Sequence, residues 1–110
     1  MDVKVADIVF NFSNLKTSKK RPVLVLKDNL PFDDFIAIPI SSQINKLHKD
    51  EYLLDNTAFA TGNIPKTSKL MLRKTFVVAK SVVIKKYGHL DKKYFDKYRR
   101  LFCQYFECDK

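Results

Sequence analysis

The sequence predicts a mainly β protein, built as a small, partly open barrel with one helix at the C-terminus. The first nine-tenths of the chain consists of short apolar, β-branched runs separated by turn residues, as in small β-barrels. From Asp91 onward, apolar residues recur at spacings of three and four, the period of a helix. The 110 residues, 45% of them hydrophobic, suffice for one modest core in a single domain over residues 1–110. Together these observations favour an SH3-like barrel.

Three strands are expected in the first half of the chain, at residues 5–10, 21–27 and 35–41. Segment 11–20 is polar and lysine-rich, so it is expected to be a long, mobile connection. Segment 28–34 contains Asp, Asn and Pro, which predicts a turn. The Val-Leu-Val-Leu run of the second strand predicts burial on both faces. The hairpin between the second and third strands should bring Arg21 and Ser41 to the same end of the sheet.

The second half is expected to add strands at residues 52–54, 69–74 and 76–87. Within the last of these, residues 79–81 are expected to form a tight turn or a single helical turn. Only Gly62 and Gly88 occur in the chain, so each should mark a bend or a left-handed residue, and Gly88 should close the sheet region.

The C-terminal segment predicts one amphipathic helix with Asp91 as its N-cap. Its apolar face consists of Tyr94, Tyr98, Leu101, Phe102, Tyr105 and Phe106. Because so small a domain needs this face to complete its core, we expect it to pack on the sheet or at a dimer seam rather than on a membrane. The opposite, basic face is interpreted as a solvated surface rather than an RNA contact.

The charge balance points to a polyanionic partner. Lys and Arg number 21 against 12 acidic residues, a formal net charge of +9, which suits nucleic acid, an acidic protein or an anionic membrane. No run approaches the roughly 18 apolar residues that a membrane span needs, and the N-terminus lacks the apolar stretch of a signal peptide. A cytoplasmic protein is therefore expected.

Cysteine and histidine placement predicts neither a disulfide nor a metal site. Cys103 and Cys108 lie five residues apart in the predicted helix, so their sulfurs should point in different directions. His48 and His89 are far apart in sequence, and no Cys or His pair has ligand spacing. We interpret both histidines as surface or packing residues and expect no metal or other cofactor.

Several motifs follow one another in an order that carries a family resemblance. They are Ala6-Asp7-Ile8-Val9-Phe10, Lys19-Lys20-Arg21-Pro22, Ile38-Pro39-Ile40-Ser41-Ser42-Gln43, Thr61-Gly62-Asn63-Ile64-Pro65 and Val82 to Leu90. In order and spacing this set resembles the MazF/PemK (Kid-like) toxins over nearly the whole chain. The resemblance implies a CcdB/PemK-type barrel and a sequence-specific, metal-independent endoribonuclease. Such an enzyme cuts single-stranded RNA by attack of the neighbouring 2′-hydroxyl, works as a homodimer and is neutralised by an antitoxin.

The resemblance also implies site residues. Arg21 matches the family's catalytic arginine, which stabilises the charge on the phosphate. Ser41 matches the family's catalytic threonine or serine after the third strand, whose hydroxyl donates to the scissile phosphate. Ser42 and Gln43 beside it are RNA-binding candidates, and the sequence does not decide which of the two serines contacts the phosphate. Arg73 falls where many relatives carry an acidic residue or glutamine. It is a catalytic candidate that can bind phosphate, but it leaves no evident general base.

Lysines in the first long loop and the basic second half of the chain are candidates for binding RNA or an acidic antitoxin. Lys16, Lys19 and Lys20 lie in the loop that, in relatives, folds over the RNA or is held by the antitoxin. From residue 66 to residue 100 there are twelve Lys or Arg residues against Asp91 and Asp96, a field that suits RNA or the acidic tail of an antitoxin. Two alternatives remain: a non-catalytic RNA-binding member of the family, and a CcdB-like toxin that binds DNA gyrase.

Overall fold

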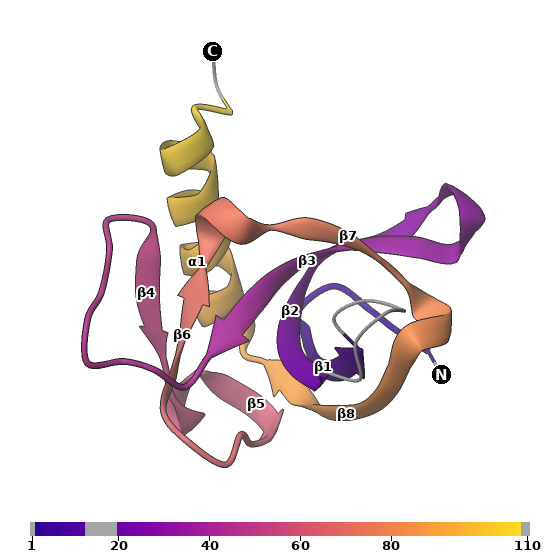
Figure 1. The fold of residues 1–110 in the computed structure, drawn as a ribbon, viewed down its shortest axis with the longest axis horizontal. Coiled ribbons are helices and arrows are strands. Elements are labelled where there is room, and N and C mark those ends of the chain that lie inside the picture. The colour runs from indigo at the N-terminus through magenta and orange to yellow at the C-terminus, as the bar shows by residue number, and fades with distance from the viewer. Residues whose placement is uncertain (1, 13–19, 109–110) are drawn as a thin grey trace.

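The computed structural model describes residues 2–12 and 20–108, and it has the mainly β architecture with a C-terminal helix that the sequence predicts (Figure 1). Within those residues the strands are β1 (Asp7–Phe12), β2 (Lys20–Leu30), β3 (Asp34–Ser41), β4 (Glu51–Leu54), β5 (Phe59–Gly62), β6 (Ser68–Met71), β7 (Phe76–Ala79) and β8 (Val83–Leu90). Helix α1 spans Lys92–Phe106, and four single 3₁₀ turns lie at Pro31–Asp33, Asn56–Ala58, Leu72–Lys74 and Lys80–Val82.

The strands form one curled sheet in the order β4-β6-β3-β2-β1-β8-β5, with β7 also paired to β3 (Figure 1). Strand β3 changes partner along its length, because residues 34–37 pair with β7 whereas Ile40 and Ser41 pair with β6. Register shifts interrupt the β2–β3 and β1–β8 pairs, and such irregularities increase the local bend and twist of a strand. The sheet therefore curls into a partly open barrel, with the β4–β6 arm to one side.

Strand β2 separates two apolar clusters, as its sequence predicts. Leu24 belongs to a large cluster with Ile8 and Ile38, which also receives helix α1. Val23 and Val25 point the other way, into a smaller cluster that contains Phe35. All six of these side chains are fully buried. Alternate side chains of a strand face opposite sides of the sheet, so one continuous apolar run supplies both clusters.

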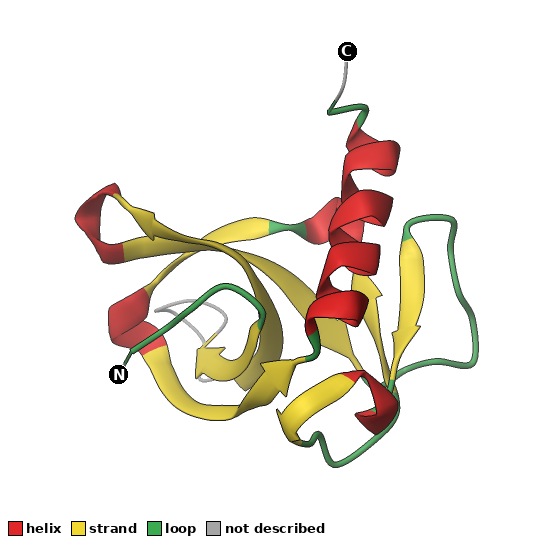
Figure 2. Cartoon of the chain, turned by 180° about the vertical axis from the view of Figure 1, so that it is seen from behind, coloured by secondary structure: helices red, strands yellow, loops and turns green. Residues whose placement is uncertain are grey.

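Helix α1 crosses between the curled part of the sheet and the β4–β6 arm (Figure 2). Asp91 caps it as predicted, because its carboxylate accepts the backbone N–H of Lys93 at 2.9 Å. The hydroxyl of Tyr98 donates to the carbonyl of Leu53 at 2.7 Å, and burial raises the pKa of Tyr98 to about 12. Over the part of the chain that the structure describes, no helix is long and apolar enough to cross a membrane.

Several strand boundaries differ from the sequence prediction. Asn11 and Phe12 extend β1, Lys20 begins β2, and β2 continues through the expected turn to Leu30. The remainder of the predicted connection, residues 13–19, lies outside the described residues. Residues Leu72–Lys74 form a 3₁₀ turn rather than the end of a strand, because the chain leaves β6 to enter β7. The helical turn expected at residues 79–81 is present as Lys80–Val82.

The two glycines lie opposite each other where β5 pairs with β8. Gly62 is left-handed, with φ of 75°, as expected. Gly88 does not close the sheet, since β8 continues to Leu90. Instead it lets the strands approach, because a Cβ on Gly88 would lie 2.2 Å from the carbonyl oxygen of Thr61. Strand β5 itself was not predicted, since its short, mostly exposed sequence carries no alternating pattern.

Candidate functional site

The candidate site is an open groove of about 600 Å³ that runs past the ends of β2, β3 and β6. It gathers most of the residues that the sequence singles out. Those that line it are Lys20, Arg21, Ser41, Ser42, Gln43 and Arg73. Lys16 and Lys19, the other two candidates, lie outside the described residues. Segments far apart in the chain thus converge on one surface.

The hairpin of β2 and β3 brings Arg21 and Ser41 together. Val23 pairs with Pro39 in the antiparallel register, and two residues further along each strand that register sets Arg21 opposite Ser41. Pro22, at the groove beside Arg21, is opposite Phe10 of β1. A guanidinium and a hydroxyl are therefore presented at the same end of the sheet, where both can donate hydrogen bonds to an anion.

Ser41 begins a tight turn out of β3. Its hydroxyl oxygen accepts the backbone N–H of Gln43 at 3.2 Å, which orients the side chain and leaves the hydroxyl proton available to donate. Ser41 is half-buried, whereas Ser42 and Gln43 are exposed along the groove. Ser41 also pairs with Lys69 of β6, so the hydroxyl is fixed to the sheet.

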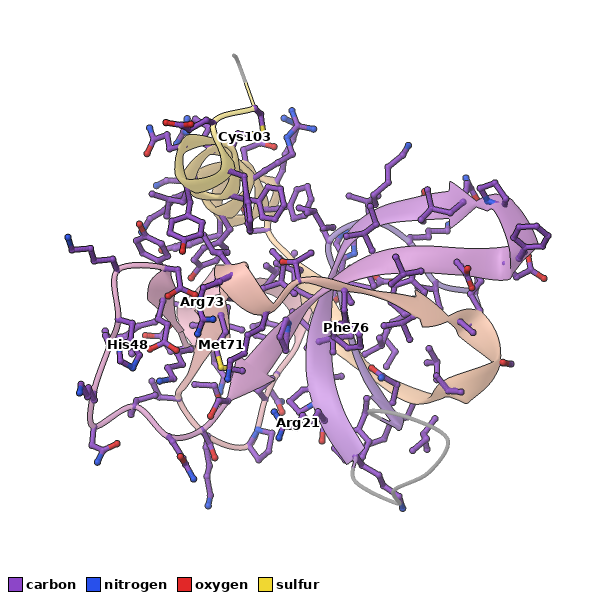
Figure 3. All side chains as sticks on the ribbon, turned by 45° about the horizontal axis from the view of Figure 1, so that its top comes forward. Arg21, His48, Met71, Arg73, Phe76 and Cys103 are labelled. Carbon is purple, nitrogen blue, oxygen red and sulfur yellow. The ribbon has the colours of Figure 1, made fainter. Side chains whose placement is uncertain are left out.

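Arg73 lies in the 3₁₀ turn that follows β6; it lines the same groove as Arg21 and is set apart from it in Figure 3. Its backbone N–H donates to a carboxylate oxygen of Asp50 at 3.0 Å, and the N–H of Leu72 donates to the backbone carbonyl of Asp50 at 3.0 Å. Asp50 is itself buried. These bonds hold the turn against the end of the β3–β4 loop and leave the guanidinium of Arg73 exposed.

A buried ion pair at the floor of the groove was not predicted. The Nζ of Lys69 lies 2.8 Å from Oε1 of Glu51, and their side chains are 10% and 6% exposed. Burial favours a raised pKa for Glu51, but the hydrogen bonds from Lys69 and the N–H of His48, with the nearby positive charge, lower it overall. The sequence signal that could have indicated this pair is a charged residue in each of two short apolar runs, Glu51 in one and Lys69 in the other.

Phe10 and Tyr87 form an aromatic corner in the groove. The rings of Phe10 and Tyr87 meet edge to face with centroids 5.5 Å apart, and both residues line the groove. The Nζ of Lys85 lies 4.9 Å from the centroid of Tyr87 and 5.5 Å from that of Phe10. Burial raises the pKa of the Tyr87 hydroxyl. Aromatic faces beside a cation form a surface on which a nucleobase can stack.

The groove is strongly cationic. Its basic side chains are Lys20, Arg21, Lys66, Lys69, Arg73 and Lys74. Against these, Glu51 is the one carboxylate that lines it within the described residues, and Lys69 neutralises that charge. In residues 2–12 and 20–108, no group of three or more His, Cys, Asp or Glu side chains is arranged so that it could hold a metal ion. The site is built to receive an anion.

Comparison with solved structures identifies the same fold in mycobacterial toxins and endoribonucleases. The Mycobacterium tuberculosis toxin MazF-mt6 is 16% identical, with a TM-score of 0.70 over 92% of this chain and 96% of that one. An endoribonuclease in complex with its cognate antitoxin, from a mycobacterial species, is 9% identical, with a TM-score of 0.74 over 96% of each chain. A further mycobacterial endoribonuclease is 12% identical, with a TM-score of 0.70 over 97% of this chain and 94% of that one.

Comparison with curated proteins gives no match. A family model, in contrast, matches residues 5–106, which is nearly the whole chain. The resemblance inferred from the motif order is thereby confirmed, and the chain belongs to the PemK-like, MazF-like toxins of type II toxin–antitoxin systems.

Proposed function

We propose that this protein is a toxin endoribonuclease that cleaves single-stranded RNA without a metal ion, by attack of a 2′-hydroxyl on the adjacent phosphate. The observation that carries the proposal is the convergence of Arg21 and Ser41 in one cationic groove. Membership of the toxin family supports it, and two of the similar structures are described as endoribonucleases.

Arg21 and Ser41 have the chemistry that this reaction needs. A guanidinium can hold two phosphate oxygens in a fork, and its charge opposes the negative charge that grows as phosphorus becomes five-coordinate. The Ser41 hydroxyl, held by Gln43, can donate to a third oxygen. Both groups come from strands of the sheet rather than from a free loop, so they are oriented before the RNA arrives. Arg73, which lines the same groove, would add a second guanidinium.

The walls of the groove suit a single strand. The cations on both sides can follow a phosphate backbone, and the rings of Phe10 and Tyr87 offer a stacking surface that a paired base could not reach. Ser42 and Gln43, exposed along the groove, can donate to and accept from base edges, which is the means by which cleavage would become sequence-specific.

The charges of the groove support cleavage without a metal ion. Hard cations such as Mg²⁺ require oxygen ligands, principally carboxylates. The carboxylate of Glu51 is engaged by Lys69, and the surrounding side chains are cations that would repel a metal ion. The guanidiniums of Arg21 and Arg73 would supply the positive charge instead.

The proposal includes two protein partners in the cytoplasm, where messenger RNA is available. One is a cognate antitoxin, a partner supported by the similar structure that is described as an endoribonuclease in complex with its cognate antitoxin. We expect the antitoxin of this protein to carry an acidic tail, because the groove is cationic. Such a tail would cover the same cations that bind RNA. The other is a second copy of this chain, because a single barrel of this size provides half of the RNA groove of the family.

The test is cleavage of a long, unstructured RNA by purified protein, with Arg21→Ala beside the wild type. We expect Arg21→Ala to lower the rate about 100-fold or more, as loss of one donor to a developing oxyanion does. Arg99→Ala is the matched control, because Arg99 is exposed on α1 and does not line the groove. Equal rates for Arg21→Ala and Arg99→Ala would remove Arg21 from the mechanism. Binding without cleavage by the wild type would instead favour an RNA-binding member of the family.

A further inference from the structure

We propose that the imidazole of His48 is the general base that takes the proton from the 2′-hydroxyl. This inference rests on the ribonuclease function proposed above and supplies a proton acceptor, which the guanidinium of Arg73 does not provide. It replaces our interpretation of His48 as a surface or packing residue. His48 lies in the β3–β4 loop and lines the groove, near Met71 and Arg73 in Figure 3.

Elimination among the groove-lining side chains leads to His48. The lysines and arginines of the groove are hydrogen-bond donors without an acceptor. Glu51 is ion-paired with Lys69, and its lowered pKa makes it a weak base. The raised pKa of Tyr87 keeps its hydroxyl protonated. Of the described residues that line the groove, His48 therefore carries the side chain best suited to accept a proton, and imidazole is the commonest general base in enzymes.

The backbone holds His48 in place although it lies in a loop. Its N–H donates to Oε1 of Glu51 at 2.8 Å, and its carbonyl accepts the N–H of Glu51 at 3.0 Å. The Nζ of Lys69 reaches the same loop two residues earlier, where it donates to the carbonyl of Lys46 at 3.0 Å. The buried Glu51–Lys69 pair thus clamps the loop at two points and fixes the position from which the imidazole enters the groove.

The proton transfers balance with this assignment. The 2′ oxygen forms a bond to phosphorus while the free imidazole nitrogen of His48 takes its proton. The bond between phosphorus and the 5′ oxygen breaks, and that oxygen takes a proton from a water molecule in the open groove. The resulting hydroxide accepts the proton from the imidazolium. His48 ends neutral, and the products are a 2′,3′-cyclic phosphate and a 5′-hydroxyl.

The test compares His48→Ala with the wild type in RNA cleavage, with and without added imidazole. Loss of a general base lowers rates by about 10²- to 10⁴-fold, so we expect a loss in that range. Added imidazole should restore part of the rate in His48→Ala but not in Arg21→Ala. Asn45→Ala is the control, because Asn45 is exposed on the same loop and does not line the groove.

A binding measurement with RNA distinguishes a general base at His48 from a residue that only contacts the RNA. A 2′-deoxy substitution at the cleavage site gives a probe that cannot react, and His48→Ala should bind it within about twofold of the wild type. Near-wild-type cleavage by His48→Ala would overturn the assignment, and so would a loss of cleavage that imidazole does not rescue and that parallels a loss of binding. Absence of cleavage by the wild type would instead overturn the ribonuclease function itself.

Discussion

The Nζ of Lys69 and Oε1 of Glu51 lie 2.8 Å apart, on diagonal positions of the paired strands β4 and β6, beneath the candidate RNA groove. The same two side chains bond the N–H of His48 and the carbonyl of Lys46. A buried ion pair contributes little to stability by itself, since desolvation opposes the attraction of the charges. Its position suggests a different role here, which is to hold the β3–β4 loop in one conformation.

Lys69→Met tests that role. Removal of one partner leaves a buried, uncompensated carboxylate, and we expect the free energy of unfolding to fall by about 3 kcal/mol. Urea denaturation measures the loss. Lys66→Met is the control, because Lys66 lines the same groove but is exposed.

A double variant separates stability from loop placement. Glu51→Leu combined with Lys69→Met should recover much of the stability, since apolar residues can replace a buried pair. RNA cleavage should nevertheless remain impaired, because the loop that carries His48 has lost both anchors. A double variant that cleaves at the wild-type rate would show that the pair does not position the loop.

Alkaline pH should weaken the attachment of helix α1 through Tyr98. The reference pKa of 10.0 applies to the unfolded chain, and the folded pKa is about 12, so the protonated hydroxyl stabilises the fold below pH 10.0. As pH rises from 10.0 towards 12, that contribution of about 2 kcal/mol is lost.

The measurement is the melting temperature of wild type and Tyr98→Phe across this pH range. At neutral pH Tyr98→Phe should be less stable by about 1 kcal/mol, the usual effect of one hydrogen bond. The difference should shrink with rising pH and reverse sign before pH 12, because ionisation of Tyr98 costs the wild type about 2 kcal/mol whereas Phe does not ionise. A difference that stays constant to pH 12 would contradict the raised pKa.

Gly62→Ala should destabilise the junction of β5 and β8. A Cβ at Gly62 would lie 2.1 Å from the carbonyl oxygen of Tyr87, and the left-handed φ of 75° adds backbone strain. Movement of Tyr87 would disturb the aromatic corner as well. We expect a drop of about 2 kcal/mol or more in unfolding free energy. Thr61→Ala, at the adjacent and exposed position, should change it by less than about 0.5 kcal/mol.

The elements of the fold that could be predicted are those whose apolar pattern lies within one short segment of the sequence. The Val-Leu-Val-Leu run required a strand buried on both faces, and the change to helical spacing after Asp91 required a capped helix. Strand β5 and the 3₁₀ turn at Leu72–Lys74 were missed, because they are set by partners distant in sequence rather than by their own pattern.

The same distinction applies to the candidate site. One hairpin connects β2 to β3, so the approach of Arg21 to Ser41 could be anticipated. The Glu51–Lys69 pair depends on the pairing of β4 with β6, and the place of His48 at the groove depends on that pair. The spacing of Glu51, Lys69 and His48 in the sequence does not predict that the ion pair holds His48 at the groove. For that reason the sequence alone favours a surface or packing role for His48.

The ends of the RNA fragments that the purified protein produces with EDTA present would distinguish attack by a 2′-hydroxyl from hydrolysis that depends on a metal ion. We expect discrete fragments with 5′-hydroxyl and 2′,3′-cyclic or 3′-phosphate ends, and no cut where the 2′-hydroxyl at the cleavage site is replaced by hydrogen. Fragments with 5′-phosphate ends, cleavage that requires a divalent metal, or cutting at the 2′-deoxy position would contradict the proposed mechanism.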